Sequence, residues 1–77
     1  MTTLPDIIVR GRTQKGMTQN ELAIAIEVKA GGAQISKWER GALPEPKNVT
    51  RMIEVLDLDR EETWLAFGRA VDAANAL

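Results

Sequence analysis

Apolar residues recur along the chain at the three- and four-residue spacing of amphipathic helices, with no stretch of strand-like alternation. The pattern therefore predicts an all-α fold, a five-helix bundle in one domain. The predicted helices cover residues 6–14, 18–27, 33–40 and 46–56, with a fifth that starts near 60, passes 67 and can continue through 69–76. The first helix, with Leu4 just before it, and the fourth helix are predicted to face the core with Leu4, Ile7, Ile8, Val49, Met52, Ile53 and Leu56.

The most distinctive local signals in the sequence mark the ends of the second and third predicted helices. Thr18 can cap a helix through its hydroxyl, and Glu21, three residues later, completes a capping box. Gly31 and Gly32 precede the third helix, and Gly41 ends it, since a helix often ends at a glycine in a left-handed conformation. These signals predict two short helices joined by a turn of small residues.

The third helix has two chemically different sides. Ile35 and Trp38, at positions i and i+3, can anchor one side in the core. The other side offers small, amide, hydroxyl and cationic groups, which come from Ala33, Gln34, Ser36, Lys37 and Arg40. A helix with this division suits the major groove of DNA, where amides and cations can contact base edges and phosphates.

The spacing resembles the helix-turn-helix of the Cro/C1-type regulators, the phage repressor class also called the xenobiotic-response-element family. The matching segments are Arg12, Gly16, Thr18–Ala23, Ile35–Gly41, Pro46–Leu56 and Trp64–Gly68. The resemblance implies a lambda-repressor-like DNA-binding domain over residues 4–68. Residues 69–77 would then be a C-terminal helical extension or a frayed tail.

The chain departs from the usual pattern of this family in its turns and in two residue types. The segment between Ala23 and Ile35 is two residues longer than usual, and the link 57–63 is also about two residues longer. Glu27 replaces a common Gly, and Gly11 replaces a common core Leu. A glycine inside a helix costs about 0.5–1 kcal/mol relative to alanine, so we expect the first helix to depend on packing.

The resemblance implies that the third helix enters the major groove and that the second crosses the DNA backbone. Gln19 would either contact a phosphate or brace the third helix, and Gln34 would pair with the exposed edge of adenine. Arg40 and Lys47 would contact phosphates. The full set of predicted DNA-contacting residues is Thr18, Gln19, Lys29, Gly32, Ala33, Gln34, Ser36, Lys37, Arg40 and Lys47.

Several of these residues also have a structural interpretation. The hydroxyl of Ser36 can bond to a backbone carbonyl instead of DNA. Gly31 and Gly32 either let the backbone approach DNA closely or fill a flexible loop. Lys29, like every other Lys or Arg of the set, can simply keep its part of the surface in water.

Two further groups of residues are predicted to serve structure or assembly. In the family, the residues that match Arg12 and Glu39 tend to form an ion pair between the first and third helices, and a guanidinium suits a carboxylate partner. Trp64, Leu65 and Phe67 are candidates for a dimer surface on the fifth helix, although core packing explains them equally well.

Composition removes several classes of function. The chain has 77 residues and neither Cys nor His, which excludes disulfides and His-ligated metal sites. The acids of 57–62 precede or begin a helix, where carboxylates stabilise the positive helix end, and they lack the spacing of a calcium loop. We expect no enzyme activity, no metal and no cofactor.

The net charge is −1, and its distribution favours DNA in one half only. Residues 1–47 hold seven of the ten cations, whereas residues 48–77 hold six of the eleven acids.

The favoured function is a sequence-specific regulator that binds double-stranded DNA at a palindromic operator as a homodimer. The alternative is an antitoxin that covers a toxin with its C-terminal helix and binds its own promoter. We expect no membrane span and a cytoplasmic location.

Overall fold

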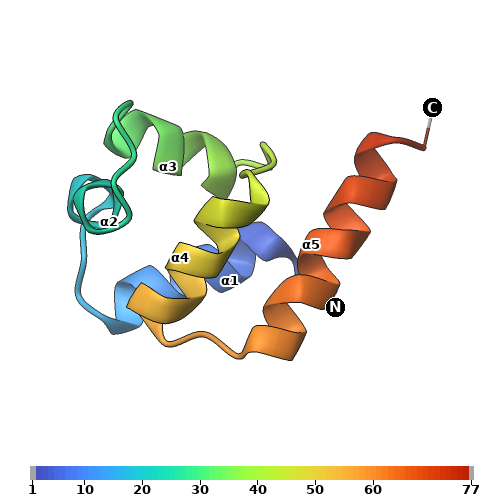
Figure 1. Cartoon of the computed structure of the whole chain (residues 1–77), viewed down its shortest axis with the longest axis horizontal. Helices are drawn as coiled ribbons and strands as arrows, with labels where there is room; N and C mark the ends of the chain where they lie inside the picture. The colour runs from blue at the N-terminus through green and yellow to red at the C-terminus, as the bar shows by residue number, and fades with distance from the viewer. Residues whose placement is uncertain (1, 77) are drawn as a thin grey trace.

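The computed structural model describes residues 2–76, and within this range the chain folds into five helices (Figure 1). The helices are α1 (Leu4–Gln14), α2 (Gln19–Ala25), α3 (Gly32–Glu39), α4 (Pro46–Leu56) and α5 (Arg60–Ala74). The predicted all-α fold is confirmed. The predicted bounds of α4 match the structure, because Pro46 opens this helix and Asp57 ends it in a left-handed conformation with φ 55°.

The first helix begins two residues earlier than predicted. The hydroxyl oxygen of Thr3 accepts a hydrogen bond from the backbone N–H of Asp6 at 3.3 Å, so Thr3 is the cap and Pro5 lies within the first turn. A proline fits there because the first helical N–H groups have no partner inside the helix. Leu4, Ile7 and Ile8 are buried, as predicted.

The core lies where α1, α2, α3 and α4 meet, and α5 closes it. Ile8, Leu22, Ile35 and Met52 are almost completely buried, and Ala66 of α5 joins them. Each of these side chains comes from a different helix. The core therefore fixes α2, α3 and the turn between them relative to the rest of the molecule.

Gly11 is buried in α1, and its small size has a packing reason. A Cβ atom at this position would lie 2.6 Å from Cδ2 of Leu58 and 3.4 Å from Cβ of Leu56. Leu58 belongs to the link between α4 and α5, and it packs against the core. The glycine in the first helix and the longer link are therefore two parts of one packing arrangement.

The turn between α2 and α3 is ordered by backbone hydrogen bonds. The N–H of Val28 donates to the carbonyl of Ala23 at 2.8 Å, and the N–H of Gly31 donates to the carbonyl of Val28 at 3.1 Å. Val28 also packs against the core. Helix α2 ends at Ala25, two residues before the predicted end, because Glu27 has a left-handed backbone with φ 61°.

We expect Glu27→Gly to raise the free energy of unfolding by about 0.5–1 kcal/mol. A left-handed conformation costs a residue with a Cβ roughly 1–2 kcal/mol, and the extra freedom of glycine in the unfolded chain offsets part of the gain. Thermal unfolding followed by circular dichroism measures the change. Glu27→Ala is the control, because it removes the carboxylate and keeps the Cβ. Equal melting temperatures for the two variants would contradict the explanation.

Helix α5 is continuous from Arg60 to Ala74 and passes position 68 without a break. The carboxylate of Asp59 caps its start by accepting from the N–H of Glu62 at 2.7 Å. The predicted extension to 76 is thus two residues too long, and residue 77 lies outside the described range. None of the helices in residues 2–76 has both the length and the apolar character needed to cross a bilayer.

Candidate nucleic-acid interface

The start of α2 is held by the capping box that the sequence predicts. The hydroxyl oxygen of Thr18 accepts from the N–H of Glu21 at 3.0 Å, and the N–H of Thr18 donates to Oε1 of Glu21 at 2.8 Å. This reciprocal arrangement satisfies backbone groups that a helix start leaves unpaired. The capping box is confirmed, and it fixes the point where α2 begins.

The carboxylate of Glu39 joins three segments of the molecule. Arg12 of α1 donates from Nε to Oε2 at 2.7 Å and from Nη2 to Oε1 at 3.2 Å. Gln19 of α2 donates from Nε2 to Oε1 at 2.8 Å, so its amide braces α3. The exposed fraction is 19% for the Arg12 side chain and 8% for that of Glu39. Arg12 also donates to the carbonyl of Met17 at 2.9 Å, which holds the turn before α2.

A second contact between α2 and α3 involves Asn20, which the sequence analysis missed. Its Oδ1 accepts from the N–H of Gly32 at 2.9 Å, at the first turn of α3. A Cβ at Gly32 would lie 2.4 Å from this oxygen and 3.0 Å from the backbone N of Asn20. Gly32 is buried and its N–H is already bonded, so this glycine is part of the packing between α2 and α3. Its predicted contact with DNA stays a prediction. The sequence signal of this close packing was the pair of adjacent glycines, Gly31 and Gly32, at the start of α3.

With one side of α3 held in this way, its opposite side is open to solvent. Ile35 and Trp38 are buried, whereas Ala33, Lys37 and Arg40 are exposed. Ser36 is half-buried beside them. Positions 33, 36, 37 and 40 follow helical periodicity and lie on one side of the helix. The structure thus brings together four of the predicted DNA-contacting residues on one surface, which we call the α3 face.

A sequence model described as helix-turn-helix matches residues 8–62, which is more than half of the chain. The chain belongs to the Cro/C1-type helix-turn-helix family. This is a family of DNA-binding regulators. Comparison with curated proteins and with solved structures gave no match. In this helix-turn-helix protein, α2 and α3 are the two helices of the motif.

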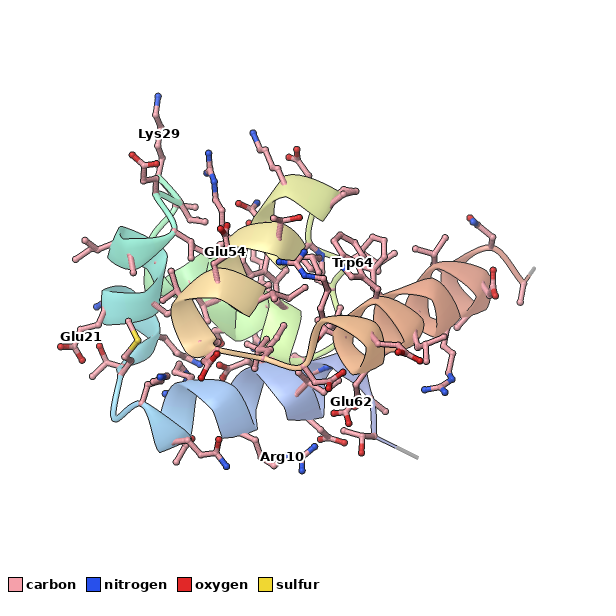
Figure 2. All side chains as sticks on the ribbon, turned by 60° about the horizontal axis from the view of Figure 1, so that its bottom comes forward. Arg10, Glu21, Lys29, Glu54, Glu62 and Trp64 are labelled. Carbon is pink, nitrogen blue, oxygen red and sulfur yellow. The ribbon has the colours of Figure 1, made fainter. Side chains whose placement is uncertain are left out.

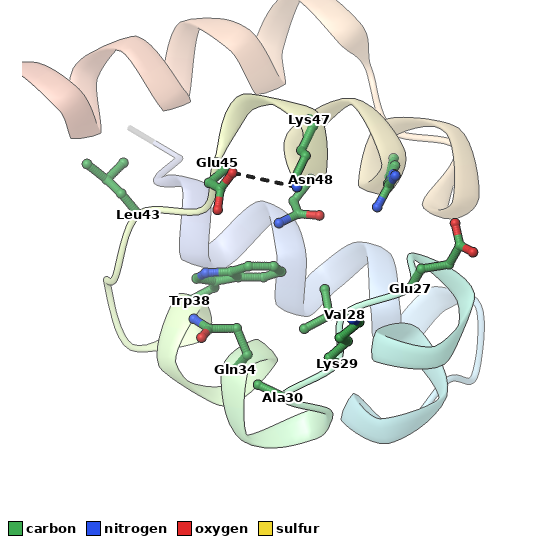
Figure 3. Close-up of a pocket in the computed structure, with 11 residues that line it drawn as sticks. Glu27, Val28, Lys29, Ala30, Gln34, Trp38, Leu43, Glu45, Lys47 and Asn48 are labelled. Atoms are coloured by element: carbon green, nitrogen blue, oxygen red, sulfur yellow. Dashed lines mark ion pairs between the residues drawn. The ribbon is translucent and has the colours of Figure 1, made fainter.

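Gln34 of the helix-turn-helix does not lie on the α3 face. It is half-buried and lines a cavity between α3 and the start of α4 (Figure 3). Its neighbours on the inward side are Ile35 and Trp38, and a residue between an exposed and a buried position falls on the flank of a helix. Gln34 is thus less open to solvent than Lys37 and Arg40, and its expected part as a base reader stays a prediction.

The remaining predicted contacts lie at the margins of the motif. Lys29 projects from the turn between α2 and α3 into solvent, on a different side of the molecule from Glu62 (Figure 2). Lys47 is exposed in the first turn of α4, where its Nζ lies 3.8 Å from Oε2 of Glu45. Both cations lie on segments that adjoin α3 in the sequence, and Thr18 caps the start of α2.

The candidate dimer residues of the helix-turn-helix protein do not form one surface. The rings of Trp64 and Phe67 pack edge to face, with centroids 5.6 Å apart and an interplanar angle of 85°. Both are half-buried, whereas Leu65 is 54% exposed and neighbours Glu61, Glu62 and Arg69. Sequence reasoning grouped the three by position along the chain, but helical geometry directs Leu65 away from the two rings.

Proposed function

We propose that the chain is a sequence-specific DNA-binding regulator that places the α3 face in the major groove. The observation that carries the proposal is this face itself, a solvent-exposed side of the second motif helix with Lys37 and Arg40. The bonds that Glu39 accepts from Arg12 and Gln19 support it, because they hold the orientation of α3 before DNA binds. Regulation through DNA binding requires no catalytic residue, so we propose no enzyme activity.

The members of the α3 face are assigned different parts in recognition. Lys37, near the middle of α3, would reach base acceptors such as those of guanine. Arg40, at the end of α3, would contact a phosphate and set the register without reading sequence. Ala33 would contact a thymine methyl group, and Ser36 would bond to a base or a phosphate.

We expect Lys37→Ala and Arg40→Ala to weaken DNA binding in different ways. Selection from a pool of random duplexes first identifies the preferred site, and fluorescence anisotropy then measures affinity at several salt concentrations. Lys37→Ala should lose about 1–3 kcal/mol on that site and relax preference at one base pair. Arg40→Ala should weaken all duplexes and reduce the salt slope by about 0.9.

The matched control for this experiment is Arg69→Ala, which removes one exposed cation from α5 and should leave affinity unchanged. A wild-type protein without sequence preference at moderate salt would contradict the proposed function. Identical effects of Lys37→Ala and Arg40→Ala would contradict the division between reading and positioning.

We further propose that the protein binds a palindromic operator as a homodimer, because two-fold related half-sites would double the contacts of a small domain. Light scattering of the free and DNA-bound protein measures the mass.

An alternative is an antitoxin that covers a toxin with α5. The specific observation that favours it is the second half of α5, which extends away from the other helices with mostly exposed residues (Figure 1).

A further inference from the structure

Arg51 links α4 to the end of α2. Its Nη1 donates to the carbonyl oxygen of Ile26 at 3.1 Å, and Ile26 is the residue that ends α2. Arg51 lies in the middle of α4 and is half-buried. Among residues 2–76, this is the only hydrogen bond between α4 and either α2 or the turn 26–31. The DNA contacts proposed above do not include Arg51.

The bond supplies a partner that α2 does not provide for itself. The last carbonyl groups of a helix lack donors within the helix and carry a negative partial charge. The last turn of α2 has no basic residue, and no backbone N–H of residues 2–76 donates to the carbonyl of Ile26. A guanidinium from α4 therefore takes the place that a Lys or Arg in the last turn of a helix can fill.

The middle of the turn has donors that the protein does not use. The backbone N–H groups of Lys29 and Ala30 have no acceptor among residues 2–76, and both residues are exposed. The ammonium group of Lys29 has no ion pair in the same range and points into solvent (Figure 2). Backbone N–H groups and lysine side chains are groups with which proteins contact DNA phosphates.

Side chains from other helices hold the two ends of this exposed segment. Oδ1 of Asn20 accepts from Gly32 at one end, and Arg51 donates to Ile26 at the other. Between these points, Val28 packs against the core. Loss of the Arg51 side chain would therefore free the start of the turn, while the bonds that hold α3 stay intact.

We infer that Arg51 is a positioning residue for DNA binding, because it fixes the turn from which Lys29 reaches a phosphate. The inference rests on the proposed function, in which the α3 face enters the major groove and brings the turn before α3 to the DNA backbone. Arg51 acts through the backbone of Ile26 and does not itself contact DNA. The segment between Ala23 and Ile35 is two residues longer than usual, and a longer loop costs more entropy to order. The bond from Arg51 offsets part of that cost.

The first test is hydrogen exchange of the ¹⁵N-labelled protein without DNA, in which the wild type is compared with Arg51→Met. The amides of Val28 and Gly31 are bonded within the turn, so their exchange reports its opening. We expect both to exchange about tenfold faster in the variant, the change expected for loss of one hydrogen bond from a charged group. The amide of Ile8, in the core, reports global unfolding and is the reference. Equal acceleration at all three amides, or none, would overturn the inference.

The second test is a double-mutant cycle of Arg51→Met and Lys29→Ala, with affinity for a duplex of arbitrary sequence measured by fluorescence anisotropy. Lys29→Ala should reduce the salt slope by about 0.9, the value for one phosphate contact. Arg51→Met should weaken binding about three- to tenfold in the wild-type protein and less than about twofold in the Lys29→Ala protein. A positioning residue has no effect once the residue that it positions is absent.

Arg10→Met is the matched control, because it removes an exposed cation from the side of the molecule away from Lys29 (Figure 2). It should change neither the exchange of the turn amides nor the affinity. A loss from Arg51→Met that is as large in the Lys29→Ala protein as in the wild type would assign Arg51 a DNA contact of its own, and the inference would be overturned. A phosphate contact carries no sequence information, so a protein that binds every duplex equally well contradicts the proposed function without affecting this test.

Discussion

Arg12→Met is expected to lower the free energy of unfolding by about 2–4 kcal/mol. The substitution keeps an apolar stem but leaves the carboxylate of Glu39, whose side chain is 8% exposed, without its cation. Gln19 remains as a neutral donor and cannot replace the charge. Domains of this size have a total stability of roughly 5 kcal/mol, so urea unfolding should show a large shift of the midpoint.

Two comparisons show whether burial is the cause. Lys47→Ala breaks an exposed ion pair of 65% and 73% side-chain exposure, and it should change stability by less than about 0.5 kcal/mol. The double variant Arg12→Met/Glu39→Leu removes the stranded charge and should recover most of the loss. If Arg12→Met were no more harmful than Lys47→Ala, the ion pair would have no structural importance.

Gly32→Ala is expected to lower the free energy of unfolding by about 1–3 kcal/mol, the usual cost of overpacking. The new methyl group would collide with Oδ1 of Asn20 and approach its backbone N, so α3 must move away from α2. The same shift would displace the α3 face. DNA affinity should therefore fall together with stability, and anisotropy at a temperature where the variant is folded measures the additional effect.

Gly68→Ala is the matched control for the same chemical change. Gly68 lies inside α5, and a Cβ there would have nothing within 4 Å. Alanine should raise stability at that site by about 0.5–1 kcal/mol, because it restricts the unfolded chain and favours the helix. A loss of stability for Gly32→Ala together with a gain for Gly68→Ala would support the packing argument. A gain at both would contradict it.

The existence of the helices was predictable, and so were those boundaries that have a strong local signal in the sequence. Pro46 and the Thr18–Glu21 capping box act within one turn, and the structure shows both where expected. Thr3 was missed as the cap of α1 because Pro5 is the stronger signal by itself. The end of α2 was misplaced since periodicity alone does not show that Glu27 takes a left-handed backbone.

The sequence predicted the residue types of the candidate interface better than it predicted where their side chains lie. Lys37 and Arg40 lie on the exposed side of α3, but Gln34 is half-buried on its flank and lines the cavity between α3 and α4. Which flank of α3 is open depends on α4 and on the longer turn, and both are packing partners from elsewhere in the chain. The residue type of Asn20 gave no sequence signal by itself for the same reason. An asparagine acquires its significance only from the groups that folding brings, or fails to bring, within hydrogen-bond distance.

The contact between Gly11 and Leu58 has a consequence for how sequences of this family are compared. A glycine in the first helix and a longer link before the fifth stand far apart in an alignment and would be scored as two independent differences. The side chain of Leu58 occupies the space that a larger residue at position 11 would fill. The glycine and the longer link therefore depend on each other in the folded protein. A relative that has either the glycine in the first helix or the longer link should be checked for the other feature.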